Sequence, residues 1–344
     1  MPAPIALVAC ALGGALCYVL HTPLPWMIGP LVTMAVLRSC GFELRAPRGA
    51  RQVGQVVISS ALGLYFTPAV AREVLAHWEL LFAAAGFATA LAYIGAWILY
   101  RWTDTDRTTA LFASVPGGAA EMANLGDRFG ARPERIAVAQ SLRIMLVVVI
   151  VPFAMTWWGV HGTETYAPAV ARFDGAGLAL LLACATGGGI ALWFVGSPNP
   201  FMLGPLAVAI GLTVAEIQWS SVPPLLLNAA QVLLACNLGS RFDGAFMRRA
   251  PRFVLVVVFG TVASMLISAA FGVALALWSG LPPGTLVLAT APGGIAEMCV
   301  TASVLQLGVP LVTAAHVARV IFLVTTTAPV FRLMRGVLRR TGRF

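Results

Sequence analysis

The sequence predicts an all-α polytopic membrane protein made of two inverted repeats, with about ten transmembrane helices plus two broken or re-entrant Pro-Gly-Gly segments. Three observations predict this fold. Hydrophobic residues make up 59% of the 344 residues and charged residues only 10%, whereas a soluble domain carries about 25% charged residues. Apolar runs follow one another along the chain, and the motifs of the first half recur in the second. The basic residues change sides between the halves, as the positive-inside rule predicts for opposite orientations.

The apolar runs give the order of the elements. In the first half they lie at about 4–20, 24–37, 52–66, 78–100, 110–124 and 136–158. In the second half they lie at about 175–195, 199–216, 225–239, 253–278, 285–300 and 311–331. Several are shorter than the roughly 20 residues that a helix perpendicular to the bilayer needs, so some helices must be short, tilted or discontinuous.

A constant offset in the numbering relates the two halves. The motif Pro-Trp-Met-Ile-Gly-Pro-Leu at 25–31 recurs as Pro-Phe-Met-Leu-Gly-Pro-Leu at 200–206, an offset of 175. One position is then gained, and an offset of 176 relates Gln55 to Gln231 and Arg143 to Arg319. Because one offset persists through separate motifs, the sequence indicates a tandem duplication.

The loop charges indicate that the repeats are inverted. Four Arg residues lie between 38 and 51, whereas the equivalent connection at 218–224 has none. The C-terminal tail is rich in Arg, whereas the equivalent loop at 159–174 carries one. We therefore predict membrane repeat 1 at 1–158, a periplasmic linker at 159–174, membrane repeat 2 at 175–334 and a basic cytoplasmic tail at 335–344.

Each half has one run that does not simply cross the membrane, because inversion requires an odd number of crossings per half. The Pro-Gly-Gly motifs are the natural candidates, since Pro costs about 3 kcal/mol in a helix interior and each Gly about 1. Backbone polar groups are not tolerated in lipid, so these segments must be buried in protein or line a wet cavity. The residues concerned are Pro116, Gly117 and Gly118 in the first half and Pro292, Gly293 and Gly294 in the second.

Two glutamates follow these motifs inside apolar sequence. Glu121 and Glu297 each lie three residues after the second Gly. An ionisable side chain at the bilayer centre costs roughly 2.5–3.5 kcal/mol and therefore marks a functional site by default. Either glutamate could bind a cation or carry a proton. The alternative is structural, in which each carboxylate caps amides of its own loop or joins an ion pair.

One arginine lies within the last run of each half, too far from the start of the run for easy snorkelling. Arg143 and Arg319 either face the glutamates as buried ion pairs or bind the carboxylate of an anionic substrate. His316 precedes Arg319 by three residues, on the same helical face, and we expect it to be a hydrogen-bonded core residue. We expect the glycines at 187–189, with Gly13 and Gly14 near the matching positions, to serve close helix packing.

The sequence lacks the motifs of several other protein classes. The six Cys have no Cys-x-x-Cys spacing, and the four His are scattered without metal-ligand spacing. Walker, dinucleotide and Gly-x-Ser-x-Gly motifs are absent from the sequence. We therefore expect no metal, no cofactor and no enzymatic activity. The Arg residues punctuate apolar runs and form no face for direct nucleic-acid binding.

The duplicated Pro-Trp-Met-x-Gly-Pro-Leu and Pro-Gly-Gly-x-x-Glu-Met motifs, each followed by an Arg, resemble the membrane AbrB family over about 6–335. Its members are labelled ammonia monooxygenases or AbrB-duplication membrane proteins. The resemblance implies an inner-membrane protein linked by name to regulation of gene expression. In architecture, the chain is also similar to cation–proton antiporters and bile-acid-type transporters.

Together these features predict a secondary transporter in the bacterial inner membrane, with proton or cation coupling and a cytoplasmic C-terminus. Its partners would be the lipid bilayer and a small solute or ion, and a homo-oligomer is compatible with the sequence. The alternative is a non-transporting membrane regulator that acts through a partner. A membrane monooxygenase ranks last.

Overall fold

The computed structural model describes residues 3–115, 119–162, 166–170, 172–242 and 249–340, except for the side chains of 119–121, 324 and 327–340. In this part of the chain every regular element is an α-helix. The first half holds α1 (Ala3–Val19), α2 (Pro25–Ser39), α3 (Ala50–Gly63), α4 (Pro68–Ala76), α5 (Trp78–Trp102), α6 (Arg107–Ser114), α7 (Ala119–Arg128) and α8 (Pro133–Trp157). The second half holds α9 (Gly175–Phe194), α10 (Pro200–Val214), α11 (Pro224–Gly239), α13 (Pro251–Ser279), α14 (Pro283–Thr290), α15 (Ile295–Val304) and α16 (Val309–Arg340).

Each predicted apolar run corresponds to one helix or to a broken pair. The run at 285–300 is divided into α14 and α15 by residues 291–294, as its Pro-Gly-Gly motif predicts. The run at 110–124 holds α6 and α7, and its motif at 116–118 lies outside the described residues. The short helix α4 was not predicted. It begins because Pro68 suits the first helical position and the Thr67 hydroxyl accepts from the Val70 amide at 3.3 Å.

The apolar helices make this a multi-pass membrane protein. Four helices, α5, α8, α9 and α13, are long and apolar enough to cross a bilayer. The count rises to five if α3 and α4, which are bent by 91° at their junction, form one span. Shorter apolar helices include α1, α10, α11, α15 and the first part of α16.

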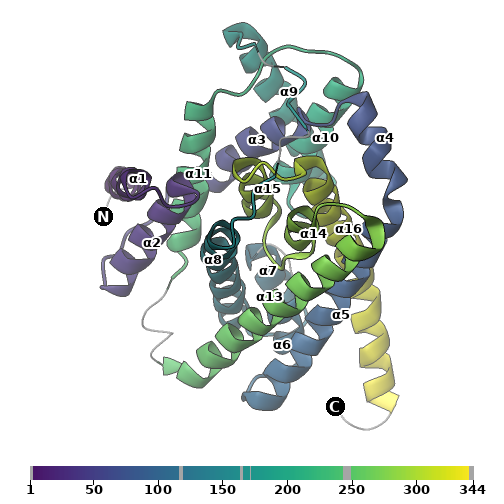
Figure 1. Cartoon of the computed structure of the whole chain (residues 1–344). Coiled ribbons are helices and arrows are strands. Elements are labelled where there is room, and N and C mark those ends of the chain that lie inside the picture. Colours follow the sequence, from purple (N-terminus) through teal and green to yellow (C-terminus); the bar gives the residue numbers. More distant parts are fainter. Residues whose placement is uncertain (1–2, 116–118, 163–165, 171, 243–248, 341–344) are drawn as a thin grey trace.

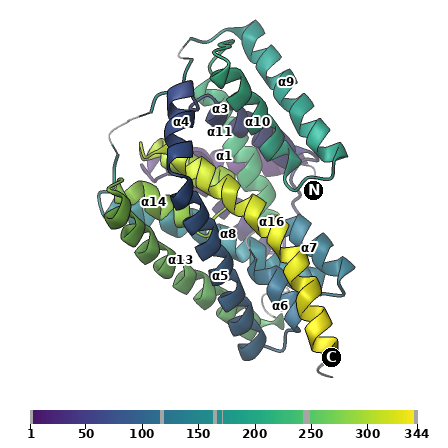
Figure 2. The ribbon, with the colours of Figure 1, turned by 90° about the vertical axis from the view of Figure 1, so that its right-hand side faces the viewer.

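The helices form two bundles (Figures 1 and 2). The six-helix bundle consists of α1, α2, α3, α9, α10 and α11, with α1 on α2, α9 on α10, and α11 on both α2 and α3. The broken-helix bundle consists of α5 to α8 and α13 to α16, with α5 packed on α16, α6 and α13. Helices α3, α8, α15 and α16 make contacts between the two bundles. Each bundle therefore takes its helices from both halves of the sequence.

Glycine contacts hold the helices of the six-helix bundle close together. A Cβ on Gly29 would collide with the carbonyl of Gly13, and a Cβ on Gly204 would collide with that of Gly188. The α1–α2 and α9–α10 pairs thus meet through matching glycines, which the offset of 175 relates to one another. The expectation of close helix packing is confirmed for Gly13, Gly14, Gly188 and Gly189, whereas nothing lies near the missing Cβ of Gly187.

Residues 159–174 mark one end of the molecule, the linker end. The Gly162 amide donates to the Leu305 carbonyl at 3.0 Å, just past α15, and the Ala169 amide donates to the Leu64 carbonyl at 2.8 Å, just past α3. The Ser221 amide, shortly before α11, donates to a carbonyl of this linker at 3.0 Å. Helices α3 and α15 therefore end at the linker end, whereas α11 begins there.

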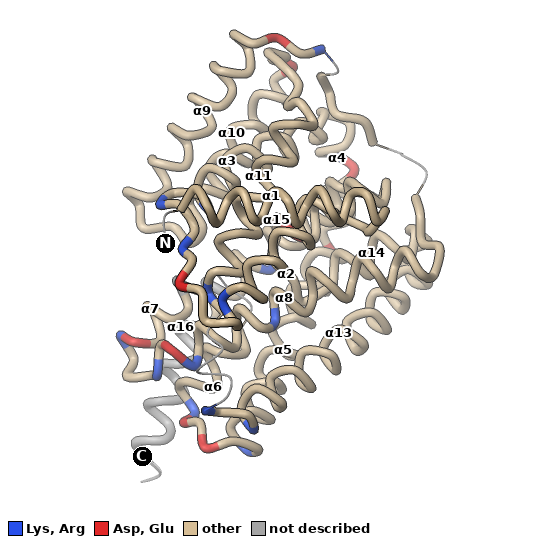
Figure 3. Tube along the Cα trace, turned by 90° about the vertical axis from the view of Figure 1, so that its left-hand side faces the viewer, with Lys and Arg blue, Asp and Glu red and all other residues tan. Residues whose placement is uncertain are grey.

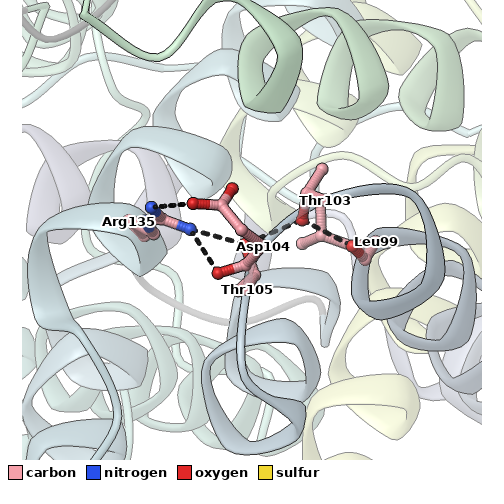
Figure 4. A network of polar contacts seen from close by, with 5 residues as sticks. All are labelled: Leu99, Thr103, Asp104, Thr105 and Arg135. Carbon is pink, nitrogen blue, oxygen red and sulfur yellow. Dashed lines mark hydrogen bonds and ion pairs between the residues drawn. The ribbon is translucent and has the colours of Figure 1, made fainter.

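The basic end lies opposite, and Arg residues gather along the chain toward it (Figure 3). There the Arg38 Nε donates to the Phe242 carbonyl at 3.3 Å, which joins the ends of α2 and α11. Arg135 at the start of α8 donates to the Thr105 hydroxyl at 2.9 Å and pairs with the Asp104 carboxylate at 3.4 Å (Figure 4). This network joins α8 to the α5–α6 turn.

Candidate functional site

The break between α14 and α15 leaves backbone carbonyls without helical partners. Helix α14 ends at Thr290 and α15 begins at Ile295. Pro292 has no N–H, so it cannot donate to the Leu288 carbonyl one turn earlier, and that carbonyl accepts from the Ala291 amide at 3.2 Å instead. The carbonyls of the last turn of any helix also lack intrahelical partners. Without other donors these buried groups would each cost about 1–3 kcal/mol.

Two side chains of α16 supply the missing donors. His316 Nε2 lies 3.0 Å from the Leu288 carbonyl oxygen. Because a carbonyl only accepts, His316 carries its proton on Nε2. Arg319 donates from Nη1 to the Ala291 carbonyl at 2.7 Å and from Nη2 to the Gly293 carbonyl at 2.5 Å. A cation at the C-terminal end of α14 also favourably meets the negative end of the helix dipole.

The first break is held in the same way by α8. Gln140 Nε2 donates to the carbonyls of Phe112 at 2.9 Å and Val115 at 2.7 Å, and Arg143 donates to the Ser114 carbonyl at 3.0 Å. The offset of 176 relates Gln140 to His316 and Phe112 to Leu288. In a continuous helix the amide of residue 116 would donate to the Phe112 carbonyl, but Pro116 has no N–H. His316 is confirmed as a hydrogen-bonded core residue, fully buried.

A further matched pair, which the sequence analysis missed, fixes the start of each broken segment. The Thr109 hydroxyl of α6 accepts from the Arg132 amide at 2.8 Å, and the Thr285 hydroxyl of α14 accepts from the Gly308 amide at 3.1 Å. The offset of 176 relates the two threonines and also the two amides. The signal was visible in the offset, but a single threonine in an apolar run carries little information by itself.

Glu297 lies at the start of α15. It is the third residue of the helix, and Gly294 is its N-cap. A Cβ on Gly294 would collide with the Glu297 carboxylate, which therefore folds back over the helix start. This is the position of the acidic residue in a capping box. Among the described residues no ion pair joins Glu297 to Arg319.

The other sequence-predicted residues are partly outside the described structure. Pro116, Gly117 and Gly118 are not described, and Glu121 is described only as a backbone position in α7. Its side-chain contacts, including any with Arg143, are not described. The structure therefore brings together Arg143, Glu297, Arg319 and the second Pro-Gly-Gly motif.

A cavity of about 90 Å³ lies between the two bundles, directly beside the second break. The broken-helix bundle lines it with Arg143, Arg319, Glu297 and the backbone of Gly293 and Gly294. The six-helix bundle lines it with Arg51, Gln55, Asn199, Asn237 and, just beyond α11, Arg241. Four guanidinium groups and one carboxylate give this lining a formal charge of +3 if all are ionised. Such a cavity favours an anion.

Arg51 and Arg241 were missed as site residues, because in the sequence they look like loop charges near run ends. The fold brings them together from opposite halves. Arg51 donates to the Asn199 side-chain oxygen at 2.6 Å, and Arg241 donates to that of Asn237 at 3.3 Å. Asn199 is the N-cap of α10 and adopts a left-handed backbone, with φ 48°.

A second cavity of about 80 Å³ lies inside the broken-helix bundle and shares Arg143 with the first. Its lining is mainly apolar; the exceptions are Arg143 and the hydroxyl residues Ser114, Thr261, Ser264, Ser268 and Thr290. Among the described residues, no group of three or more His, Cys, Asp or Glu side chains could hold a metal ion.

Comparison with known proteins places this arrangement in a family. The chain is 26% identical to "Uncharacterized protein YhjN" of Bacillus subtilis (strain 168), across 94% of this chain and 91% of that protein. It is 24% identical to "Putative regulator AbrB" of Escherichia coli (strain K12), across 90% of this chain and 89% of that protein. No solved structure matches it. The sequence profile described as "Transition state regulatory protein AbrB" matches residues 26–335. The chain, a multi-pass membrane protein, therefore belongs to the AbrB family.

Proposed function

We propose that the protein is a secondary transporter of the bacterial inner membrane that moves a small anionic solute, coupled to a proton or cation. The observation that carries the proposal is the cavity between the bundles, beside the second break. Its formal excess of positive charge suits an anion, and Glu297 offers a group for the coupling ion. In this proposal the protein is a carrier and not an enzyme, and its partners are the bilayer and the solute.

Inverted repeats support the proposal. Helix α3 ends at the linker end, whereas α11, its counterpart at the offset of 176, begins there. Likewise α14 begins beside the linker, with Gly284 against Val160, whereas its counterpart α6 begins in the Arg135 network of the basic end. We propose ten crossing helices, α1, α2, α3, α5, α8, α9, α10, α11, α13 and α16, plus the two broken pairs.

Five of these helices, α1, α2, α3, α10 and α11, have only 14 to 17 residues. At 1.5 Å per residue they are about 21–26 Å long, against about 30 Å of hydrocarbon. All belong to the six-helix bundle, so local thinning of the bilayer around that bundle would accommodate them. We place the basic end and the C-terminus in the cytoplasm and the linker end in the periplasm.

The division of the cavity suggests how transport would occur. Arg51, Asn199 and Asn237 belong to one bundle, whereas Arg319 and Glu297 belong to the other. A rigid-body displacement of one bundle against the other would therefore open the cavity to one side and close it to the other. The hydrogen bonds to the break carbonyls all lie within the broken-helix bundle, so they would survive this motion.

The test is uptake of radiolabelled small anions into proteoliposomes that contain the purified protein and carry an imposed pH gradient. We expect uptake above that of empty liposomes, and its loss in Arg51→Gln, because Arg51 lines the cavity. The matched control is Arg172→Gln, which changes an exposed Arg in the linker. Wild-type protein that moves no anion in either direction would sink the proposal.

Topology is tested separately with single cysteines in a cysteine-free background. We expect a cysteine at His161 to react with an impermeant maleimide from the periplasm, and a cysteine at Glu43 to react only after the membrane is opened. A linker that is inaccessible from the periplasm would contradict the proposed orientation.

The descriptions of the matched profile and of the Escherichia coli relative favour a second candidate, a membrane regulator of gene expression that acts through a partner. A transcriptional effect of gene deletion that is reversed when the Arg51→Gln variant is reintroduced, although that variant moves no solute, would favour the regulator. An effect that requires transport would favour the carrier.

A further inference from the structure

The cavity beside the second break offers donors that the protein itself does not use. Arg143 and Arg319 are only 8% and 4% exposed, and the Nε of each has no hydrogen-bond partner. Each guanidinium has five N–H donors and directs two hydrogen bonds at protein oxygens. An unpaired buried donor is costly, so such groups in a cavity lining indicate a ligand that accepts hydrogen bonds.

The start of α15 offers a second set of donors at the same place. The first amides of a helix have no intrahelical acceptors and lie at the positive end of the helix dipole. The N-cap of α15 is a glycine, which has no side-chain oxygen to accept from them. Residues 293–297, which include this first turn, line the cavity. These amides and the guanidinium groups could therefore bind the same anion.

Glu297 now occupies the place where such an anion would bind. Its carboxylate folds back over Gly294 at the start of α15 and is the one acidic group that lines the described cavity. An ionised Glu297 thus occupies the start of α15 and excludes another anion from it. A protonated Glu297 carries no charge and would release the place to an incoming anion.

The volume of the cavity limits that anion. At about 90 Å³ it is about three-fifths of the roughly 150 Å³ cavity that holds benzene and its six heavy atoms, so the occupant has about four heavy atoms. The planar fork of a guanidinium matches a planar carboxylate. The ligand class that fits is a short monocarboxylate such as acetate.

We propose that Glu297 is a built-in competitor of a short monocarboxylate solute, and that one proton must bind Glu297 for each solute anion that binds the cavity. The inference rests on the proposed transport function and names its substrate class and coupling. No covalent step is involved: the proton adds to the Glu297 carboxylate, which leaves the helix start, and the solute carboxylate takes its place.

Other titratable groups line the cavity with Glu297 or lie on the helices packed around it, and they set the conditions of this exchange. Arg319 comes from α16, Arg143 from α8 and Arg51 from α3. His316, also on α16, contacts the Leu288 carbonyl and is not among the residues that line the cavity. Arg241 lies just beyond α11, and Cys299 lies on α15 itself, where its thiol accepts from Thr313. Helix α14, also packed on α15, carries no titratable side chain. Among the described side chains of this lining, Glu297 is thus the acidic group on which a proton could cancel a negative charge.

The experiment measures acetate binding to the purified full-length protein by equilibrium dialysis over a range of pH in which acetate stays ionised. For the wild type we expect the dissociation constant to rise about tenfold per pH unit once Glu297 is ionised, with uptake of about one proton per acetate. For Glu297→Gln, which keeps the shape but cannot ionise, we expect tight binding at all pH values and no proton uptake.

Matched controls sharpen the result. Glu134→Gln changes an exposed carboxylate at the start of α8 and should keep the wild-type pH slope. Glu297→Asp keeps the titrating group and, if Glu297→Gln does not fold, should still show proton uptake with acetate. Benzoate, which is too large for the cavity, should bind at least tenfold more weakly than acetate.

The outcomes separate the inference from the function on which it rests. Acetate binding without a pH slope in the wild type, or loss of binding in folded Glu297→Gln, overturns the competitor role and leaves an anion carrier standing. Binding of benzoate as tight as that of acetate overturns the substrate class. No binding of any tested anion to either protein at any pH overturns the proposed anion transport as well.

Discussion

At the break between α14 and α15, His316 donates to one carbonyl and Arg319 to two; at the break between α6 and α7, Gln140 donates to two and Arg143 to one. Three carbonyls are therefore satisfied at each break, although the division of donors is reversed. A glutamine amide has two N–H donors and a neutral imidazole has one, so the Arg supplies what its neighbour lacks. The second terminal nitrogen of Arg143 donates instead to the Gln140 oxygen, at 2.5 Å.

At both breaks three backbone carbonyls receive side-chain donors, but the side chains that supply them differ. The duplicated halves therefore retain the requirement for donors and not the identity of the donor. The surroundings of the two breaks differ more. Around the second break lie Arg51, Asn199 and Arg241. The positions one offset away from these three are Leu227, Leu24 and Tyr65. The second break thus has a lining that can bind an anion. The repeat-related residues Leu227, Leu24 and Tyr65 carry no charge and could not provide such a lining at the first break.

The largest expected effect tests the hydrogen bonds of the two arginines, each of which serves two buried acceptors. Arg319→Met leaves two buried carbonyls without these donors, and Arg143→Met does the same to the Ser114 carbonyl and the Gln140 side-chain oxygen, so each should lower the free energy of unfolding by about 2–6 kcal/mol. Unfolding of the purified variants in mixed detergent micelles provides the measurement. Exposed Arg172→Met is the control and should change little. A loss at position 143 or 319 no larger than that of Arg172→Met would contradict the counted hydrogen bonds.

The same variants test whether either arginine forms an ion pair with a glutamate. A direct buried ion pair typically loses about 3–5 kcal/mol when one partner is removed. Because Arg319 bonds to carbonyls, we expect a coupling energy below about 1 kcal/mol between Arg319→Met and Glu297→Gln in a double-mutant cycle. The same double-mutant cycle with Arg143 and Glu121 measures whether these two residues interact. The side chain of Glu121 lies outside the described structure.

The neighbouring donors should differ from each other. Gln140→Leu leaves the Phe112 and Val115 carbonyls without this donor and should cost about 2–6 kcal/mol, whereas His316→Leu leaves the Leu288 carbonyl with the Ala291 amide at 3.2 Å and should cost only about 1 kcal/mol. The exchange His316→Gln keeps a donor at the same place and should cost less than His316→Leu. If Gln and Leu at position 316 unfold alike, the hydrogen bond to Leu288 does not stabilise the break.

A smaller effect compares the halves within the six-helix bundle. Gly29→Ala and Gly204→Ala each place a methyl group against the backbone of the facing helix, and overpacking of this kind costs about 1–3 kcal/mol. Since the two crossings are matched, we expect losses of thermal stability that agree between the variants. Gly211→Ala is the control, because nothing lies near its missing Cβ. A large loss at one crossing alone would show that the bundle is not equally packed in both halves.

The smallest effect concerns a contact that one half has and the other lacks. A backbone hydrogen bond and the nearby Arg135 lower the pKa of Asp104 below its ordinary value of 3.8. A lowered pKa stabilises the fold above the ordinary value, and the contribution is lost as the pH falls through the lowered one. The corresponding residues of the second half are Gly280 and Leu311, which cannot form this pair.

We therefore expect Asp104→Asn to melt slightly below the wild type at neutral pH and together with it in acid. Exposed Asp127→Asn serves as the control, and thermal melting followed by circular dichroism is the measurement. A gap between Asp104→Asn and the wild type that persists in strong acid would assign the difference to something other than ionisation.

The family resemblance and the helix order could be predicted from the sequence because both depend on local signals. Apolar runs determine where helices form in a membrane, and proline with glycine determines where they break, as at 291–294. The family followed from motifs that occur twice, as the matched profile confirms. The short helix α4 was not predicted, because its start depends on the cap by Thr67 and on Pro68, and a hydropathy pattern does not reveal either.

The candidate site depended on tertiary structure. By itself the sequence determined that Glu297 and Arg319 stand in apolar segments and that Pro292 frees a carbonyl. The sequence could not determine that the terminal nitrogens of Arg319 donate to the Ala291 and Gly293 carbonyls, because this depends on how α16 packs beside α14. Nor could it bring Arg51 to Arg241, which lie in opposite halves of the chain. Hydropathy and helix breakers act between neighbours in the chain, whereas a cavity is formed by side chains that only folding brings together.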